Sequence, residues 1–144
     1  MNSEKISGLY LHIPFCVSKC LYCDFYSSTS ISAVSDFLDA LFKEMEMYCN
    51  RFNPFDTVYI GGGTPSLLSP EQLERILMRI RENFDLLPDS EITIEANPAD
   101  LNRSFLESMR EIGINRINIG VQSFNQKILN FLGRRHTAKQ AISA

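Results

Sequence analysis

The sequence contains no long hydrophobic run and no cluster of basic residues. None of its apolar stretches approaches the roughly 20 residues that a membrane-spanning helix requires. Its first five residues are not followed by the hydrophobic region of a signal peptide. Lys and Arg number 14 against 17 Asp and Glu, a formal net charge of −3 that offers nucleic acid no electrostatic footprint. These absences argue against a membrane-spanning, a secreted or a nucleic-acid-binding protein.

The composition is that of a folded domain. The chain is 44% hydrophobic and 22% charged, which excludes a collagen-like, low-complexity or wholly disordered protein. Its 144 residues allow one ordinary domain and leave little room for a second.

Cysteine is scarce, with four residues, and three of these lie close together. Cys16, Cys20 and Cys23 follow the spacing C-x3-C-x2-C, whereas Cys49 lies far away. A disulfide framework uses paired and dispersed cysteines in a secreted chain. The cysteine group therefore indicates a metal ion or an iron–sulfur cluster in the reducing cytoplasm. Cys49 continues the apolar stripe of an expected helix and is expected to be a small buried residue.

Hydrophobic patterns predict four strands that alternate with helices. The strands are expected over 8–13, 57–60, 91–95 and 116–119, and the helices over 34–52, 70–84, 101–112 and 128–132. Ser69 and Gln72 form the pattern of a capping box around Pro70, Gly113 marks a helix end, and a last helical signal begins at Thr137. Such alternation predicts an α/β fold with a parallel sheet.

A parallel sheet must be covered on both faces or close into a barrel, and four units cannot close one. We therefore expect the chain to be the first part of a longer protein. In parallel α/β folds the active site lies at the carboxyl ends of the strands. The four expected strands lead into the cysteine group, the glycine triplet at 61–63, Glu95 and the segment 120–123. The sequence predicts that these features meet at one edge.

Two kinds of metal centre fit the cysteine group. Three thiolates on one loop can hold three irons of a [4Fe–4S] cluster and leave the fourth iron open to another ligand. The alternative is zinc in a Cys3His set that uses His12, four residues before Cys16. The spacing favours the cluster, because His12 lies on the strand side of Pro14 and paired C-x2-C motifs are absent.

The other candidates have two interpretations each. The triplet at 61–63 lets backbone approach a ligand and offers N–H groups to an anion, or it is a flexible turn. It matches neither G-x-G-x-x-G nor a P-loop. Glu95 suits a ribose hydroxyl or an ammonium group, or it is a solvated strand end. Arg134, Arg135 and His136 can bind a carboxylate, or they complement the dipole of the preceding helix.

The cysteine spacing, with the aromatic Tyr22, resembles the motif of radical S-adenosylmethionine (radical SAM) enzymes. Five segments in order resemble the oxygen-independent coproporphyrinogen III oxidase group: YLHIPFC at 10–16, GGGTPS at 61–66, EANP at 95–98, GVQSF at 120–124 and LGR at 132–134. The resemblance implies an α/β fold, an incomplete parallel (β/α) barrel of the radical SAM type with about four βα units. Residues 1–144 would be the N-terminal part of that core domain.

The resemblance also implies a [4Fe–4S] cluster held by Cys16, Cys20 and Cys23, whose open iron takes the amino and carboxylate groups of SAM. The matching contacts of this SAM are Tyr10, Gly62 and Glu95, and those of a second SAM in the oxidase are Tyr22, Gly63, Thr64, Gln122 and Arg134. His12 matches a family histidine near the cluster. Reduction of the cluster would cleave SAM to methionine and a 5′-deoxyadenosyl radical.

The group has two branches, and one position separates them. Oxidases have a fourth cysteine two residues after the third, where this chain has Phe25. The segment 19–25 resembles instead the haem chaperone branch, the HemW-type proteins, which bind haem and pass it to apoproteins. Its expected partners are SAM, haem or a porphyrinogen, and haem-accepting proteins. The alternatives are a coproporphyrinogen III oxidase and a small zinc-binding or redox module. By chemistry alone, His12, His136 and Cys49 are candidate haem ligands.

Overall fold

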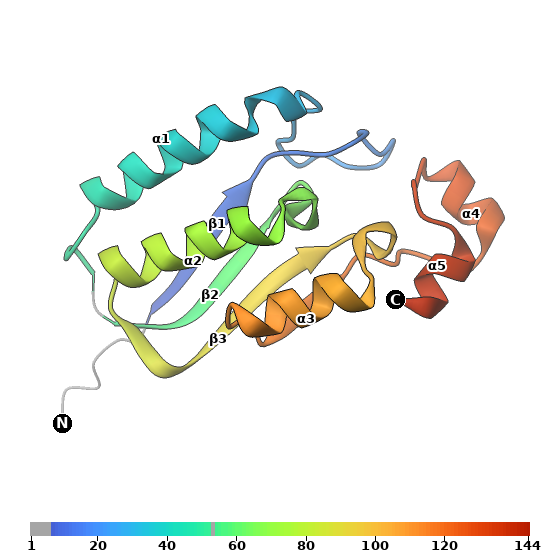
Figure 1. Ribbon diagram of the computed structural model, residues 1–144. Helices are drawn as coiled ribbons and strands as arrows, with labels where there is room; N and C mark the ends of the chain where they lie inside the picture. Colours follow the sequence, from blue (N-terminus) through green and yellow to red (C-terminus); the bar gives the residue numbers. More distant parts are fainter. Residues whose placement is uncertain (1–6, 53) are drawn as a thin grey trace.

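The computed structural model describes residues 7–52 and 54–144 (Figure 1). Its strands are β1 (Ser7–Ile13), β2 (Phe55–Gly62), β3 (Leu86–Ala96) and β4 (Arg116–Ile119). Its helices are α1 (Val34–Met47), α2 (Pro70–Asn83), α3 (Arg103–Glu111), α4 (Gln126–Phe131) and α5 (Ala138–Ser143), with 3-10 turns η1 (Ile31–Ala33), η2 (Pro65–Leu67) and η3 (Pro98–Asp100). The first five residues, on which the expectation about a signal peptide rests, lie outside this description. Within it, no helix has both the length and the apolar character that crossing a membrane requires.

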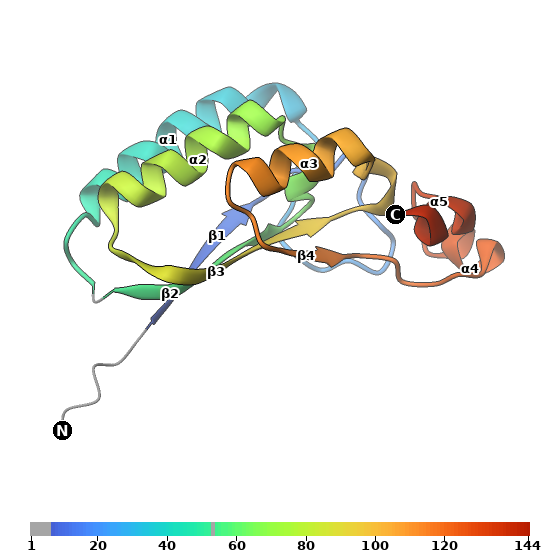
Figure 2. The ribbon, with the colours of Figure 1, turned by 60° about the horizontal axis from the view of Figure 1, so that its bottom comes forward.

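The four strands form one parallel sheet in the order β1-β2-β3-β4. Helices α1, α2 and α3 all lie on the same face of this sheet (Figure 2). A doubly wound sheet carries helices on both faces, whereas a (β/α) barrel carries them only on the outside. The arrangement therefore confirms the predicted fold class, a partial parallel (β/α) barrel.

The core lies between the sheet and these three helices. Alternate residues of each strand point to the helices, as the two-residue period of a strand requires. The buried side chains include Leu11, Ile13, Val58, Ile60 and Ile94 from the sheet and Leu38, Leu73, Ile76, Leu77 and Ile80 from the helices. The intervening strand residues point to the opposite, open face, which no helix covers in Figure 2.

Helix α1 ends earlier than its apolar pattern predicts. The helix stops at Met47, and Asn50 adopts a left-handed conformation with φ of 58° that a right-handed helix cannot include. Cys49 therefore lies beyond the helix end and is only half-buried, so its expected burial in the core is wrong. Strand β3 differs in the other direction, since it begins at Leu86 rather than near residue 91.

The fourth βα unit differs from the first three. Helices α4 and α5 have six residues each and lie beyond the carboxyl ends of the strands instead of covering the sheet (Figure 2). Thr137 forms a capping box with Gln140, which confirms the helical start expected there. This unit therefore contributes to the edge where the strands end, not to the core.

Candidate functional site

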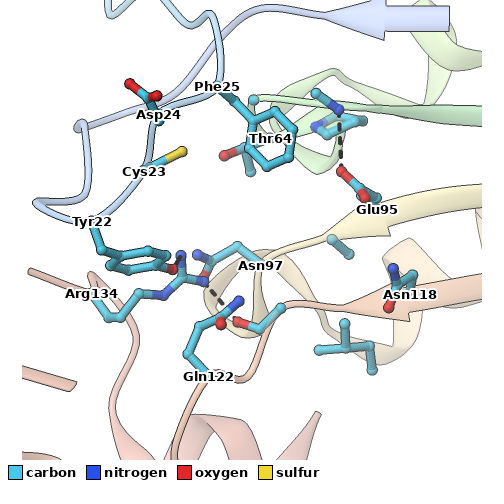
Figure 3. Close-up of a pocket in the computed structure, with 16 residues that line it drawn as sticks. Tyr22, Cys23, Asp24, Phe25, Thr64, Glu95, Asn97, Asn118, Gln122 and Arg134 are labelled. Carbon is cyan, nitrogen blue, oxygen red and sulfur yellow. Dashed lines mark hydrogen bonds between the residues drawn. The ribbon is translucent and has the colours of Figure 1, made fainter. Parts of the chain in front are cut away.

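The carboxyl ends of the four strands surround a cavity of about 710 Å³ (Figure 3). That size is within the usual range of small-molecule pockets. Its lining includes Tyr22, Cys23, Phe25, Gly62, Gly63, Thr64, Glu95, Asn97, Asn118, Gln122 and Arg134. Of the predicted SAM contacts only Tyr10 lies outside this lining, on the open face of the sheet. Cys16 and Cys20 line a small adjoining hollow together with Cys23. The predicted convergence of the strand ends is confirmed.

The cysteine loop is fastened at both ends by backbone hydrogen bonds. The Cys16 amide donates to the Ser28 carbonyl at 3.0 Å, and the Ser28 amide donates to the Pro14 carbonyl at 2.6 Å. Inside the loop, the Cys23 amide donates to the Cys20 carbonyl at 3.1 Å. This last bond turns the chain so that Cys20 and Cys23 face the same hollow.

The three thiols of this loop fit an iron–sulfur cluster. Each is half-buried and outside any disulfide. The Thr64 hydroxyl donates to the Cys16 sulfur at 3.5 Å, and the Arg134 guanidinium donates to the Cys20 sulfur at 3.4 Å. Such donors stabilise negative sulfur and tune the reduction potential of a cluster. The three thiols are thus suited to ligate three irons of a cluster.

The geometry does not support the alternative zinc site. His12 donates from Nε2 to the Tyr26 carbonyl at 3.0 Å, and its Nδ1 lies 3.0 Å from the Tyr10 hydroxyl, so both ring nitrogens are engaged. Among residues 7–52 and 54–144, no three His, Cys, Asp or Glu side chains gather closely enough to hold one metal ion. A cluster does not need that convergence, because each thiolate binds a different iron.

Close backbone packing explains the glycine triplet. Gly62 has φ of 114°, and a Cβ there would lie 2.8 Å from the His12 ring. A Cβ on Gly63 would lie 2.6 Å from the Phe15 carbonyl oxygen. Any larger residue at either position would push the glycine segment away from β1 and the cysteine loop.

The amides of this segment are already used within the protein. The Gly62 amide donates to Glu95 Oε2 at 3.1 Å. The Gly63 amide donates to the carbonyl of Ile13, the last residue of β1, at 2.9 Å, and the Thr64 amide donates to the Phe15 carbonyl at 2.7 Å. The Gly62 amide thus binds an anion of the protein itself, the Glu95 carboxylate, and the Gly63 amide binds a carbonyl, so neither is left for the anion of a ligand. The role of these glycines is instead to let the backbone pack closely against β1 and the cysteine loop.

Glu95 is a half-buried, hydrogen-bonded carboxylate rather than a solvated strand end. The Tyr59 hydroxyl donates to its Oε1 at 2.7 Å, and Asn118 donates in turn to the Tyr59 hydroxyl at 2.9 Å. Burial, followed by the hydrogen bond to Glu95, raises the pKa of Tyr59. Burial and the Glu95 charge likewise raise the pKa of Tyr10. Both phenols therefore remain protonated at neutral pH.

Sequence reasoning missed Tyr59 and Asn118. The available signal was the strand period, since each lies between two apolar residues of a strand, and alternate strand residues point to opposite faces. Both side chains must then share the open face with Glu95.

Arg134 joins the cysteine loop to the end of β4. Its Nη1 donates to the Tyr22 hydroxyl at 3.2 Å as well as to the Cys20 sulfur, and its Nη2 donates to the Gly120 carbonyl at 2.7 Å. Figure 3 shows Tyr22 beside Arg134 at the end of the cavity opposite Glu95. Gln122, next to this end, has φ of 63°.

The two residues after Arg134 also bind within the protein. Arg135 pairs with Asp100, which also accepts a hydrogen bond from Ser66 at 2.6 Å. His136 is 1% exposed and donates from Nε2 to the Val121 carbonyl at 3.0 Å. Burial, and then the nearby arginine charges, lower its pKa. Of the three basic residues, only Arg135 binds a carboxylate among the described residues, and this carboxylate is Asp100 of the protein itself.

None of the candidate haem ligands is favoured by this geometry. Both ring nitrogens of His12 have partners, and His136 is buried. Cys49 follows α1, at the end of that helix remote from the cysteine loop (Figure 1).

The family comparison agrees with this site. The family profile of the radical SAM superfamily matches residues 10–144, and the chain belongs to that superfamily. Membership implies a [4Fe–4S] cluster and SAM as cofactors.

The names of the individual relatives state different functions. The chain is 41% identical over 142 residues to the heme chaperone HemW of Lactococcus lactis, covering 98% of this chain and 37% of that protein. It is 40% identical over 140 residues to the anaerobilin synthase of Escherichia coli O157:H7, covering 94% and 32%. The solved coproporphyrinogen III oxidase HemN of Escherichia coli superposes with a TM-score of 0.89 at 33% identity, over 97% of this chain and 33% of that one. The chain thus spans only 32–37% of the length of these relatives.

Proposed function

We propose that this chain is the cluster- and SAM-binding part of a radical SAM protein of the haem chaperone type, which binds haem and delivers it to apoproteins. The meeting of the cysteine loop, Glu95 and Arg134 around one cavity carries the proposal. The 41% identity to a protein named heme chaperone supports the branch, as does Phe25 at the place of the oxidases' fourth cysteine. Residues 1–144 would form the N-terminal part of the radical SAM core.

The chain's own residues would hold and orient the cofactors. Cys16, Cys20 and Cys23 would each ligate one iron. Glu95 would accept hydrogen bonds from the SAM ammonium group, since an ionised carboxylate is an acceptor only. When bound and reduced, the cluster supplies the electron that cleaves SAM, and the protein provides position and shielding.

The cysteine loop offers an apolar surface beside the cavity. Leu21, Phe25 and Tyr26 are 84%, 66% and 79% exposed, and Phe25 also lines the cavity. Of the three, Phe25 is the one whose exposed ring faces the cavity. An exposed aromatic ring at this place suits contact with one face of a flat apolar macrocycle, which supports haem as a ligand.

The second candidate is coproporphyrinogen III oxidase activity. The TM-score of 0.89 to the solved oxidase favours it, whereas Phe25 does not. Haem retention and porphyrinogen decarboxylation must therefore both be measured on the cluster-loaded protein. Haem retained without decarboxylation supports the chaperone, and decarboxylation supports the oxidase.

The first test is anaerobic reconstitution with iron and sulfide, followed by iron counting and EPR with and without SAM. We expect a [4Fe–4S] signal that shifts when SAM is added. Replacement of Cys20 by Ala removes a proposed ligand and should abolish stable cluster assembly. Cys49→Ala is the matched control and should leave the iron content unchanged. Equal iron loss in both variants, or tightly held zinc without a cluster, would contradict the proposal.

A further inference from the structure

A chain of hydrogen bonds crosses three strands on the open face of the sheet. It runs from Asn118 on β4 to the Tyr59 hydroxyl on β2, and from that hydroxyl to Glu95 Oε1 on β3. The Gly62 amide donates to the other carboxylate oxygen at 3.1 Å (Figure 3). Each oxygen of Glu95 therefore has one fixed donor.

The position of Tyr59 is set by its neighbours. Its ring stacks on Tyr10, with 6.1 Å between ring centroids and 27° between planes, and the two residues pair across β1 and β2. On the other side Gly61 leaves the necessary space, since a Cβ there would lie 2.8 Å from Tyr59 Cε1 and 3.1 Å from Glu95 Oε2. The phenol ring is thus packed against Tyr10 of β1 and against the Gly61 backbone of its own strand.

The direction of the Tyr59 proton follows from this arrangement. Asn118 donates its amide proton to the phenol oxygen, so the phenol proton is free to point at Glu95. Each carboxylate oxygen can accept about two hydrogen bonds, which leaves one lone pair on each for a ligand. Glu95 lines the cavity, where such a ligand would lie.

We propose that Tyr59, oriented by Asn118, is a positioning residue that holds the Glu95 carboxylate with its remaining lone pairs toward the ammonium group of SAM. The inference rests on the proposed role of Glu95. Loss of the Tyr59 hydroxyl would free the carboxylate to rotate, and the ligand would then have to order it on binding.

The test is a double-mutant cycle on the reconstituted protein, with SAM affinity measured by calorimetry. Tyr59→Phe should raise the Kd for SAM about tenfold, the scale of one hydrogen bond to a charged group. Glu95→Gln should raise it at least as much, and Tyr59→Phe should add nothing in that background, because the two residues act as one unit. Tyr48→Phe, the same chemical change at the end of α1, is the control and should leave the Kd unchanged.

A second ligand separates positioning from general loss of structure. An S-adenosyl analogue without the amino group should bind wild type and Tyr59→Phe equally well. Asn118→Ala should weaken SAM binding in the same direction by a smaller factor. All variants should retain the wild-type iron content.

Three outcomes would overturn the inference. These are an unchanged Kd in Tyr59→Phe, an equal loss in both backgrounds of the cycle, and an equal loss for the analogue without the amino group. If Glu95→Gln itself leaves SAM affinity unchanged, the proposed role of Glu95 fails and the inference fails with it. The result for Glu95→Gln therefore shows whether only the role of Tyr59 fails or the role of Glu95 fails as well.

Discussion

The two faces of the sheet differ in what their side chains contact. On the helical face, Leu11, Ile60 and Ile94 are buried beneath α1, α2 and α3. On the open face, Tyr59 and Glu95 are hydrogen-bonded to one another and line or adjoin the cavity. The same strands thus serve two purposes, because alternate residues point in opposite directions. The helical face stabilises the fold, and the open face is available for chemistry.

Truncation of a helical-face residue should have the largest effect on stability. Leu77 on α2 is fully buried, so Leu77→Ala should lower the free energy of unfolding by about 2–5 kcal/mol through lost burial and the remaining cavity. Urea unfolding measures this change.

The matched truncation on the open face is Asn118→Ala. Asn118 is exposed, and among the described residues its side chain bonds only the Tyr59 hydroxyl, so we expect a loss below about 1 kcal/mol. If both truncations lowered the free energy of unfolding equally, the open face would contribute to stability as much as the helical face does, which would contradict the comparison.

The fold could be predicted from the sequence because its signals are local. Four apolar strands alternating with amphipathic helices require a parallel sheet, and sequential strand order follows from short crossovers. The capping box at Ser69 formed as predicted. The end of α1 could not be predicted, since the apolar pattern continues to Phe52 although the backbone turns at Asn50.

The site was only partly predictable. Strand ends identify Glu95 and the cysteine loop, because any parallel sheet brings its carboxyl ends to one edge. Hydrogen bonds between distant residues have no local signal. The link between Ser66 and Asp100, and the donation by Gly62 to Glu95, depend on the register of neighbouring strands and on tertiary packing. The partners of the Gly62 and Gly63 amides could not be predicted for the same reason.

At the carboxyl edge of the sheet, we expect a loss of stability between those of the two truncations. Asp100 accepts from Ser66 and pairs with Arg135, and both charged side chains are largely buried. Asp100→Ala should cost about 2 kcal/mol, because it leaves a hydroxyl and a guanidinium without their acceptor. Asp100→Asn keeps an acceptor for Ser66 and should cost less, as urea unfolding can measure. Equal stability of wild type and Asp100→Ala would mean that this edge contributes nothing to the fold.

The smallest expected effect is a pH dependence at the same edge, from His136. Burial and the charges of Arg134 and Arg135 lower its pKa in the folded protein, against about 6.5 in an unfolded chain. As pH falls below that unfolded value, the unfolded chain binds a proton that the folded chain does not, so stability decreases. His136→Gln removes the titrating group, so its stability should fall less steeply than that of wild type over this range. Carboxylates titrate in both proteins and cancel in the difference between the two urea-unfolding curves. Parallel curves would mean that His136 binds protons equally in both states and that its burial has no cost in acid.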